Sequence, residues 1–315
     1  MLLVGHGDCA RMLPKLDRIA AEQHGLLTCR DVLQVGVPPA TLTSWIRRGR
    51  LRPLHRGVYA PEGVAVTPEL TARAATLATG HADAAASHQT AARVHGIGLL
   101  IVDGAAHVTV PTDVHRPSRP ELFVHRSDLA ADEVTVRGTL RVTSVPRTLH
   151  DLLRGAERLG AVWACEAALR RDLLAERELD ALVSRSAGRS YGARMRRRRA
   201  LLDVRSESPL ETAIRLVLHD AGLPPPVSQH PLRTEDGHLL ARLDLAWPDA
   251  RMGLEADGKE PHGKPRPVYT DRWRTNALVG WQLVRFTWYD VLRRPAYVVA
   301  TVRAHLAAAG LTPAA

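Results

Sequence analysis

Cysteine is scarce in this chain of 315 residues, which contains only three. Cys9, Cys29 and Cys165 lie far apart and form no CxxC pair, so the sequence indicates neither a disulfide framework nor a zinc knuckle. Long apolar runs are also missing, since none approaches the roughly 18 residues that a membrane span needs. The apolar stretch at the N-terminus is too short for a signal peptide. We therefore expect a protein of the reducing cytoplasm without a membrane partner.

Acidic side chains are outnumbered by basic ones. The chain has 43 Lys and Arg against 33 Asp and Glu, a formal net charge of +10, and nearly all of the positive charge comes from Arg. Such a balance favours polyanions through counterion release, and the planar Arg fork suits phosphate. The composition indicates a nucleic-acid partner, unless it only reflects a GC-rich genome that encodes Arg freely. The length is enough for two or three domains, each with its own core.

Residues 12–62 have the pattern of a winged helix-turn-helix. A short first helix is followed by Thr28, with Asp31 three residues later, which is a capping-box start for a second helix. A third helix opens at Pro39 and ends at Gly49. The alternating basic segment that follows predicts a small hairpin, the wing.

In a winged helix-turn-helix, the third helix faces a DNA groove and the wing meets phosphates. The predicted contacts on this helix are Thr43, Ser44, Arg47 and Arg48, and those in the wing are Arg50, Arg52 and Arg56. Trp45 is expected to pack inward. The alternative is a protein-docking module whose arginines are merely solvated.

Residues 66–155 are expected to form a mixed region in which helices, including ones over 68–79 and 84–94, alternate with short strands. Histidines are scattered through it, among them His88, His95, His107, His115, His125 and His150. Their spacings fit no known metal-ligand pattern, so we expect them to be hydrogen-bonded or exposed. Residues 156–203 predict a helical connector with a basic run, which either contacts a DNA backbone or is solvated.

Two neighbouring strands of a predicted C-terminal meander carry acidic residues. If the hairpin between them is symmetric, Trp247 pairs with Met252 and Asp244 lies opposite Glu255, with Cβ atoms about 5 Å apart. Side chains alternate along a strand, so Asp257 is expected to point the same way as Glu255. Three carboxylates therefore converge on one surface.

Converging carboxylates are costly without a positive partner, and hard oxygen ligands suit Mg²⁺. Mg²⁺ held in this way keeps open positions for water and a scissile phosphate. Lys259 is expected to contact the phosphate, provided that the strand stays extended through Gly258. The alternative is an exposed sheet face whose charges pair with Arg242 and Arg251.

The C-terminal part resembles a known family over residues 204–308. A helix that Ser208 caps and that carries Glu211 is followed by RLDLAW, LEADGKEPHG and YTDRWRTNALVGWQLVRFTWYDVL. These segments are similar to the endonuclease-like domain related to very-short-patch repair (Vsr) enzymes, in the PD-(D/E)XK superfamily. The resemblance implies metal-dependent DNA cleavage by a domain with a central mixed sheet flanked by helices. It implies catalytic and metal-binding roles for Asp244 and Glu255, with Asp257 in support.

The resemblance also assigns the acidic residue of the leading helix to Glu211 or Glu207. Two features depart from the family's pattern. His262 is displaced by an insertion relative to the His of many relatives, and Asp257 stands where the commonest nucleases have Lys. Either change is compatible with altered metal handling or with an inactive site. The helix after the acidic strand carries two arginines that are expected to face the DNA backbone or to pair with the carboxylates, Arg272 and Arg274.

Residues 15–60 resemble the winged-helix domain of AbiEi-type antitoxins from abortive-infection systems. The segments SHQTAARVHGI and VTSVPRTLHDLL look like the middle portion of that family. The resemblance implies a transcriptional autoregulator that binds operator DNA. It also implies a toxin or another defence-system protein as a partner.

These features predict an α+β multidomain protein. An N-terminal winged helix-turn-helix (12–62), a mixed middle region (66–155) and a helical connector (156–203) precede a restriction-endonuclease-like α/β domain with a central mixed sheet (204–310). One hypothesis is a Mg²⁺-dependent DNA endonuclease. The second is an AbiEi-like antitoxin or transcriptional regulator whose nuclease-like domain is non-catalytic, and a third is a nucleic-acid clamp within a defence complex. Double-stranded DNA is the expected partner, and the sequence leaves the oligomeric state open.

Overall fold

The computed structural model describes residues 9–100, 104–233, 236–258 and 280–311. The chain divides into two compact units, one formed by Met1–Gly160 with Leu173–Met195 and the other by Ala161–Asp172 with Arg196–Ala315. The connector expected over residues 156–203 is therefore shared between the two. None of the described helices combines the length and the apolar character that a membrane span requires.

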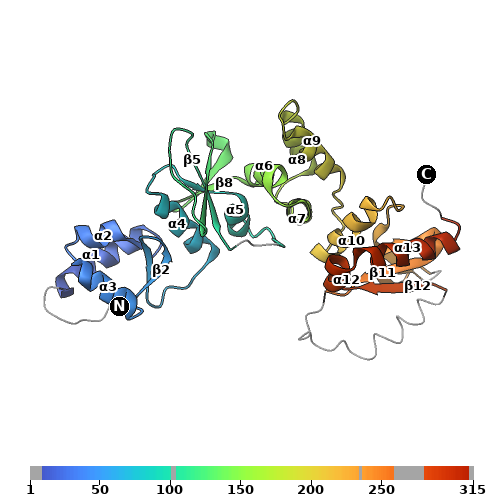
Figure 1. Ribbon diagram of the computed structural model, residues 1–315, viewed down its shortest axis with the longest axis horizontal. Coiled ribbons are helices and arrows are strands. Elements are labelled where there is room, and N and C mark those ends of the chain that lie inside the picture. Colours follow the sequence, from blue (N-terminus) through green and yellow to red (C-terminus); the bar gives the residue numbers. More distant parts are fainter. Residues whose placement is uncertain (1–8, 101–103, 234–235, 259–279, 312–315) are drawn as a thin grey trace. The chain divides into compact units, whose positions relative to one another are not determined.

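The first unit begins with three helices and a small sheet (Figure 1). The helices are α1 (Cys9–Glu22), α2 (Cys29–Gln34) and α3 (Pro39–Arg47). The sheet has the order β1-β3-β2, with β1 (Leu27–Thr28), β2 (Leu51–His55) and β3 (Val58–Pro61). The predicted helices and hairpin are thus present, and β1 is an addition too short to leave a sequence pattern.

Local sequence sets the boundaries of these elements. The hydroxyl of Thr28 accepts a hydrogen bond from the backbone N–H of Asp31 (3.1 Å), whose carboxylate accepts one from the N–H of Thr28 (2.8 Å). This reciprocal pair is the predicted capping box, and it satisfies two donors that a helix start leaves without partners. Trp45 is buried, as predicted, in a core with Leu16 and Tyr59.

The middle of the first unit is a five-stranded sheet with helices packed against it. Its order is β6-β5-β4-β8-β7, from β4 (Ala85–Ala86), β5 (Ala106–Val110), β6 (Leu122–Arg126), β7 (Val134–Arg137) and β8 (Leu140–Thr143). The helices of this region are α4 (Pro68–Thr79), α5 (His88–Val94) and α6 (Val145–Gly155). A short 3-10 turn, η1 (Ala131–Glu133), precedes β7.

One prediction for this region is wrong. A single helix was expected over residues 84–94, but Ala85 and Ala86 form the central strand and the helix starts only at His88. β4 pairs with β5 on one side and with β8 on the other. These pairings link distant parts of the chain and outweigh the helix propensity of a run of alanines.

Three further helices complete the centre of the chain: α7 (Arg158–Arg170), α8 (Glu176–Arg185) and α9 (Gly192–Ala200). The basic run falls in α9, whose last turn contains Arg197, Arg198 and Arg199. The boundary between the two units crosses both α7 and α9.

The second unit contains a four-stranded mixed sheet (Figure 1). Its order is β12-β11-β10-β9, from β9 (Val227–Arg233), β10 (Leu239–Trp247), β11 (Met252–Ala256) and β12 (Gln282–Phe286). The first three strands run antiparallel, whereas β12 is parallel to β11. Packed helices accompany the sheet: α10 (Pro209–Asp220), α12 (Trp288–Arg293) and α13 (Pro295–Ala308). A 3-10 turn, η2 (Pro248–Ala250), joins β10 to β11.

A buried carboxylate ties α7 to α10 within this unit. Glu166 is 0% exposed and forms an ion pair with Arg215. It also accepts hydrogen bonds from the hydroxyl of Thr212 (2.5 Å) and from the backbone N–H of Asp203 (2.8 Å). Burial raises the pKa of Glu166, while Arg215 opposes that rise. A charge removed from water is tolerated here because each of its oxygens has partners.

Glu166→Ala is expected to lower the free energy of unfolding of the second unit by about 3–5 kcal/mol, because the Arg215 guanidinium would be left without its buried partner. Urea denaturation measures this loss. Asp249→Ala, at an exposed position of η2, is the control and should change stability little. Equal effects of the two substitutions would show that the Glu166 network does not hold α7 to α10.

Candidate functional site

The exposed face of α3 carries two arginines in succession at its C-terminal end. Arg47 and Arg48 are both exposed. Thr43 is exposed one turn earlier, where its hydroxyl donates to the carbonyl of Pro39 (3.0 Å), and Ser44 is half-buried. Three of the four residues that were predicted to contact DNA from this helix are therefore exposed.

The hairpin formed by β2 and β3 carries the other predicted contacts. Arg52 and Arg56 are exposed and Arg50 is half-buried. The guanidinium of Arg52 donates to the carbonyl of Val64 (3.1 Å). Within the described ranges, no ion pair involves these three arginines, Arg47 or Arg48. The positive charge of this surface is therefore available to a polyanion.

The carboxylate site lies where β10 and β11 meet. Trp247 pairs with Met252 and Leu245 with Leu254, which confirms the predicted hairpin register. This pairing ends at Leu245 and Leu254, and Asp244 and Glu255 are the next residues on the two strands. The carboxylate of Asp244 accepts a hydrogen bond from the backbone N–H of Ala256 (2.8 Å), so this side chain reaches across to β11 beside Glu255.

Leu243 and Gln229, which lie beside Asp244, depart from a regular sheet, although the register of β10 with β9 is unbroken from Ala241 to Ala246. Leu243 packs with Ala246, and a Cβ at Gly253 would lie 2.7 Å from a methyl group of Leu243. Gly253 pairs with Ala246, so Leu243 and Ala246 lie on one face, although strict alternation would separate them. On the other side, Gln229 lies opposite Asp244 in the register with β9 and has a φ of 54°.

A left-handed backbone at a residue other than glycine costs about 1–2 kcal/mol, and such strain often marks a functional position. The strained Gln229 donates from its side-chain amide to the carboxylate of Glu211 (2.8 Å). That carboxylate also accepts from the backbone N–H of Glu207 (2.9 Å). Through its hydrogen bond, Gln229 connects β9 to Glu211 on α10.

Glu211 does not complete the predicted capping box. Ser208 caps α10 through the N–H of Glu211 (3.2 Å), but the Glu211 carboxylate bonds to Glu207 and Gln229 instead of to Ser208. Glu211 is only 4% exposed, and burial, with the nearby charge of Asp244, raises its pKa. Glu211 and Asp244 are thus close enough to repel each other.

Glu255 and Asp257 have different surroundings. Glu255 is 7% exposed and accepts a hydrogen bond from Nε of Arg285 on β12 (2.8 Å). β11 ends at Ala256, so the prediction that Asp257 continues the strand is wrong. The N–H of Asp257 donates to the carbonyl of Phe286, and that of Gly258 to Ala256, and this turn ends the alternation.

The alternative expected the carboxylates at the hairpin to pair with Arg242 and Arg251 on an exposed sheet face. The expected pairing with Arg242 is wrong. Arg242 pairs with Glu207 (2.7 Å) and not with the carboxylates at the hairpin. Several other predicted site residues, namely Lys259, His262, Arg272 and Arg274, lie outside the described residues.

The donor set at this site suits a hard divalent cation. Asp244, Glu255 and Glu211 offer oxygen atoms only, which is the chemistry that Mg²⁺ prefers. Each carboxylate has a hydrogen-bond donor that fixes its orientation, and the repulsion between Glu211 and Asp244 is of the kind that a bound cation relieves. The oxygen atoms are of the type that Mg²⁺ prefers, but among the described residues only three histidines, His88, His107 and His125, bring possible ligand atoms within 4.8 Å of one another. The carboxylates therefore do not form a closed set of ligands, and Mg²⁺ binding here stays a prediction.

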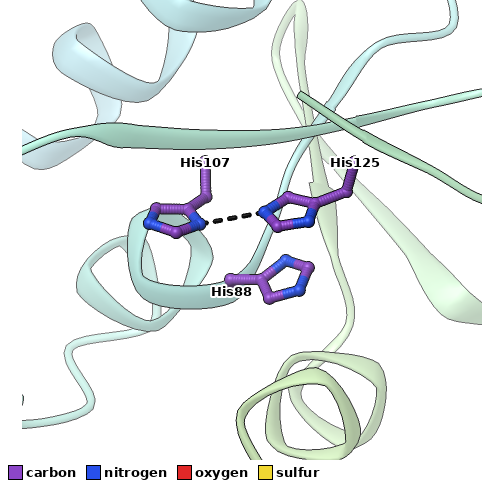
Figure 2. Close-up of side chains that lie close together, drawn as sticks. All are labelled: His88, His107 and His125. Carbon is purple, nitrogen blue, oxygen red and sulfur yellow. Dashed lines mark hydrogen bonds between the residues drawn. The ribbon is translucent and has the colours of Figure 1, made fainter. Parts of the chain in front are cut away.

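The structure also brings together three histidines that were expected to be unrelated: His88, His107 and His125 (Figure 2). Their sequence spacing gave no sign of this, because it depends on the parallel pairing of β5 with β6. A weaker signal was present. Apolar residues alternate with His107 in β5, which places its side chain on the face opposite to Ala106 and Val108.

Comparison with known proteins identifies a family for the N-terminal residues and two relatives for most of the chain. Residues 14–61 match the AbiEi_4 family, described as "Transcriptional regulator, AbiEi antitoxin". Over 266 residues the chain is 33% identical to the uncharacterized protein Rv2248 of Mycobacterium tuberculosis strain H37Rv. The match covers 83% of this chain and 94% of that protein. The uncharacterized protein MT2308 of strain CDC 1551 gives the same identity and coverage.

This chain belongs to the family of these mycobacterial proteins. Within it, the AbiEi antitoxin domain accounts for the three helices and the hairpin at the N-terminus. The AbiEi_4 match does not reach the four-stranded sheet, so the resemblance of residues 204–308 to Vsr-related endonucleases stays a prediction.

Glu211→Gln is expected to raise the free energy of unfolding at neutral pH. Glutamine keeps an acceptor for Glu207 and Gln229 but removes a charge that burial and Asp244 disfavour. Because the pKa of Glu211 is raised in the folded state, the wild type loses stability as the pH rises through that folded value, whereas the variant does not.

Chemical denaturation at several pH values tests this. The advantage of Glu211→Gln should vanish below the ordinary glutamate pKa of 4.5, where both states of the wild type are protonated. Glu207→Gln is the matched control, because Glu207 is exposed and pairs with Arg242. A variant less stable than the wild type at neutral pH would contradict the repulsion between Glu211 and Asp244.

Proposed function

We propose that the protein is a DNA-binding transcriptional regulator or antitoxin of the AbiEi type. The observation that carries this proposal is the set of five arginines on α3 and the β2–β3 hairpin. They lie within the segment that matches the AbiEi antitoxin family and have no acidic partner among the described residues. The order of three helices and a hairpin is that of a winged helix-turn-helix, which supports a groove contact by α3.

Each part of this surface has its own role in the proposal. The hairpin arginines contact phosphates, which positions the domain without selecting a sequence. Thr43, which is exposed, and Ser44, which is half-buried, are the α3 residues proposed to contact base edges. A toxin or another defence-system protein is the further partner that this function implies.

Arg47→Ala combined with Arg48→Ala is expected to weaken binding to the DNA upstream of the protein's own coding sequence. Each lost phosphate contact lowers the slope of log K against log salt by roughly 0.9. Binding at several salt concentrations, with footprinting, measures both effects. Arg18→Ala combined with Arg30→Ala removes the same charge from exposed positions on α1 and α2 and serves as the control. Equal losses in the two double variants would mean that only net charge matters.

A second function is favoured by the carboxylates of the other unit. We propose that this unit is a metal-dependent DNA endonuclease in which Asp244 and Glu255 hold Mg²⁺ and Glu211 assists. The order of α10, three antiparallel strands and a parallel β12 supports this proposal, because it agrees with the restriction-endonuclease layout that the sequence predicts. When bound, the metal would activate water and stabilise charge on the scissile phosphate.

The chain's own residues would orient this site. Gln229 and the Glu207 N–H hold the Glu211 carboxylate, and the Ala256 N–H holds Asp244. Arg285 restrains Glu255 while remaining largely exposed, so its guanidinium is free to contact a phosphate.

Asp244→Asn is expected to reduce Mg²⁺-stimulated DNA cleavage by at least about a hundredfold, because a ligand carboxylate is lost. DNA binding should be unchanged, since α3 and the hairpin are untouched. Cleavage of duplex and mismatched DNA, with and without Mg²⁺ or Mn²⁺, measures the loss, and Asp249→Asn is the control on the adjoining turn. If the wild type nicks none of these substrates when metal is added, the endonuclease proposal is wrong and the regulator remains.

A further inference from the structure

Three histidines meet on one face of the five-stranded sheet of the first unit (Figure 2). His107 lies on β5 and His125 on β6, two strands that pair in parallel. In that register His107 is level with Phe123 and Thr109 with His125, so both imidazoles point to the same side. His88 is the first residue of α5, directly after the central strand β4.

The imidazole nitrogens are close to one another. Nδ1 of His107 and Nε2 of His125 are 3.0 Å apart, and one nitrogen from each of the three residues lies within 4.8 Å of the others. The ring of His88 stacks on that of His125 with centroids 3.7 Å apart. His88 and His107 are buried and His125 is half-buried.

The backbone holds these rings in place at a cost. His88 has a φ of 49°, in the left-handed region that residues other than glycine seldom adopt. Such a conformation persists only where the surrounding structure fixes it, and it often marks a functional site. The N–H of Ser87 donates to the carbonyl of His107 (3.0 Å), and the N–H of His107 donates to the hydroxyl of Thr90 (2.7 Å).

A buried carboxylate stands behind the cluster. Asp151 on α6 is 0% exposed and lies 3.9 Å from Nδ1 of His88, too far for a hydrogen bond, while Oγ of Ser87 lies 3.0 Å from the same nitrogen. Nε of Arg147 donates to both of its oxygens at 3.1 Å, and Arg147 also reaches Glu133 and Ser127. Burial by itself raises the pKa of Asp151, but the hydrogen bond from His150, the charges of His88 and Arg147 and the hydrogen bonds from Arg147 keep it below its usual range. A carboxylate is a usual outer partner of a metal-bound histidine, and Asp151 can take this role for His88 once the ring turns toward it.

We propose that His88, His107 and His125 form a binding site for a divalent transition-metal ion such as Zn²⁺, with Asp151 as the outer partner of His88. Three imidazole ligands with a fourth position left for water or substrate is an arrangement known for catalytic zinc. Nitrogen ligands select such ions over Mg²⁺, so this site is independent of the carboxylates in the second unit.

The spacing of the imidazole nitrogens agrees with this role. His107 and His125 already lie at the separation of two ligands on one ion, for which each metal–nitrogen bond is about 2.0–2.1 Å. Binding then requires His88 to turn from its stacked position on His125 toward the same centre.

Titration of the metal-free full chain with Zn²⁺ by calorimetry, and with Co²⁺ by visible absorption, tests the proposal. We expect one ion per chain in the histidine cluster and a Co²⁺ spectrum typical of four-coordinate nitrogen ligation. His107→Gln and His125→Gln should each weaken Zn²⁺ binding by at least about a hundredfold, and Asp151→Asn by about 10–100-fold. His115→Gln, at an exposed histidine outside the cluster, should bind Zn²⁺ as the wild type does.

The proposal is overturned if the wild type takes up no Zn²⁺ at a one-to-one ratio, or if His107→Gln and His125→Gln bind it with unchanged affinity. It is equally overturned if Asp244→Asn abolishes binding, because the ion would then belong to the carboxylate site. Circular dichroism checks the fold of each variant. Should the cluster variants fail to fold, the Co²⁺ spectrum of the wild type decides, and six-coordinate weak bands would count against the histidine ligands.

Discussion

Each of the two units buries a carboxylate, Glu166 in one and Asp151 in the other. Removing a charge from water is costly, so each carboxylate needs donors from the residues around it. In the second unit, Glu166 is acceptable only because α10 supplies Arg215 and Thr212. In the first, Asp151 depends on the two contacts from Arg147. The partners of Glu166 lie on another helix, so this ion pair fixes α7 against α10. Arg147 lies on α6 itself, one turn before Asp151, and it connects that helix to Glu133 and Ser127.

The carboxylate site follows the same rule with less complete compensation. Glu211 has two hydrogen-bond donors but faces the charge of Asp244, and its pKa is raised, first of all by burial. A residue with a purely structural role would not need that charge, because glutamine offers the same shape and an acceptor oxygen. The strained backbone of Gln229 points in the same direction, since it adds cost in order to hold Glu211 in place.

Sequence reasoning succeeded where a structure is determined locally. The capping box at Thr28 and the pairing of Trp247 with Met252 depend on residues close together in the chain, and both are confirmed. It failed where distant pairing decides. The helix expected from residue 84 is replaced by β4, which pairs with β5 and β8, and the turn after Ala256 removes Asp257 from the strand. The histidine cluster was missed for the same reason, because three separate elements must be assembled before the rings meet.

The contact between Arg285 and Glu255 bears directly on whether the second unit is catalytic or only binds. An arginine that filled the space between the carboxylates would replace the metal and favour a regulator. Arg285 contacts Glu255 alone among the described residues, through Nε, and its side chain is 59% exposed. An ion pair that open to solvent contributes only about 0–1 kcal/mol, so a divalent cation competes with it easily. Glu211, whose pKa is raised first by burial and also by the charge of Asp244, is the second observation that bears on the proposed metal site.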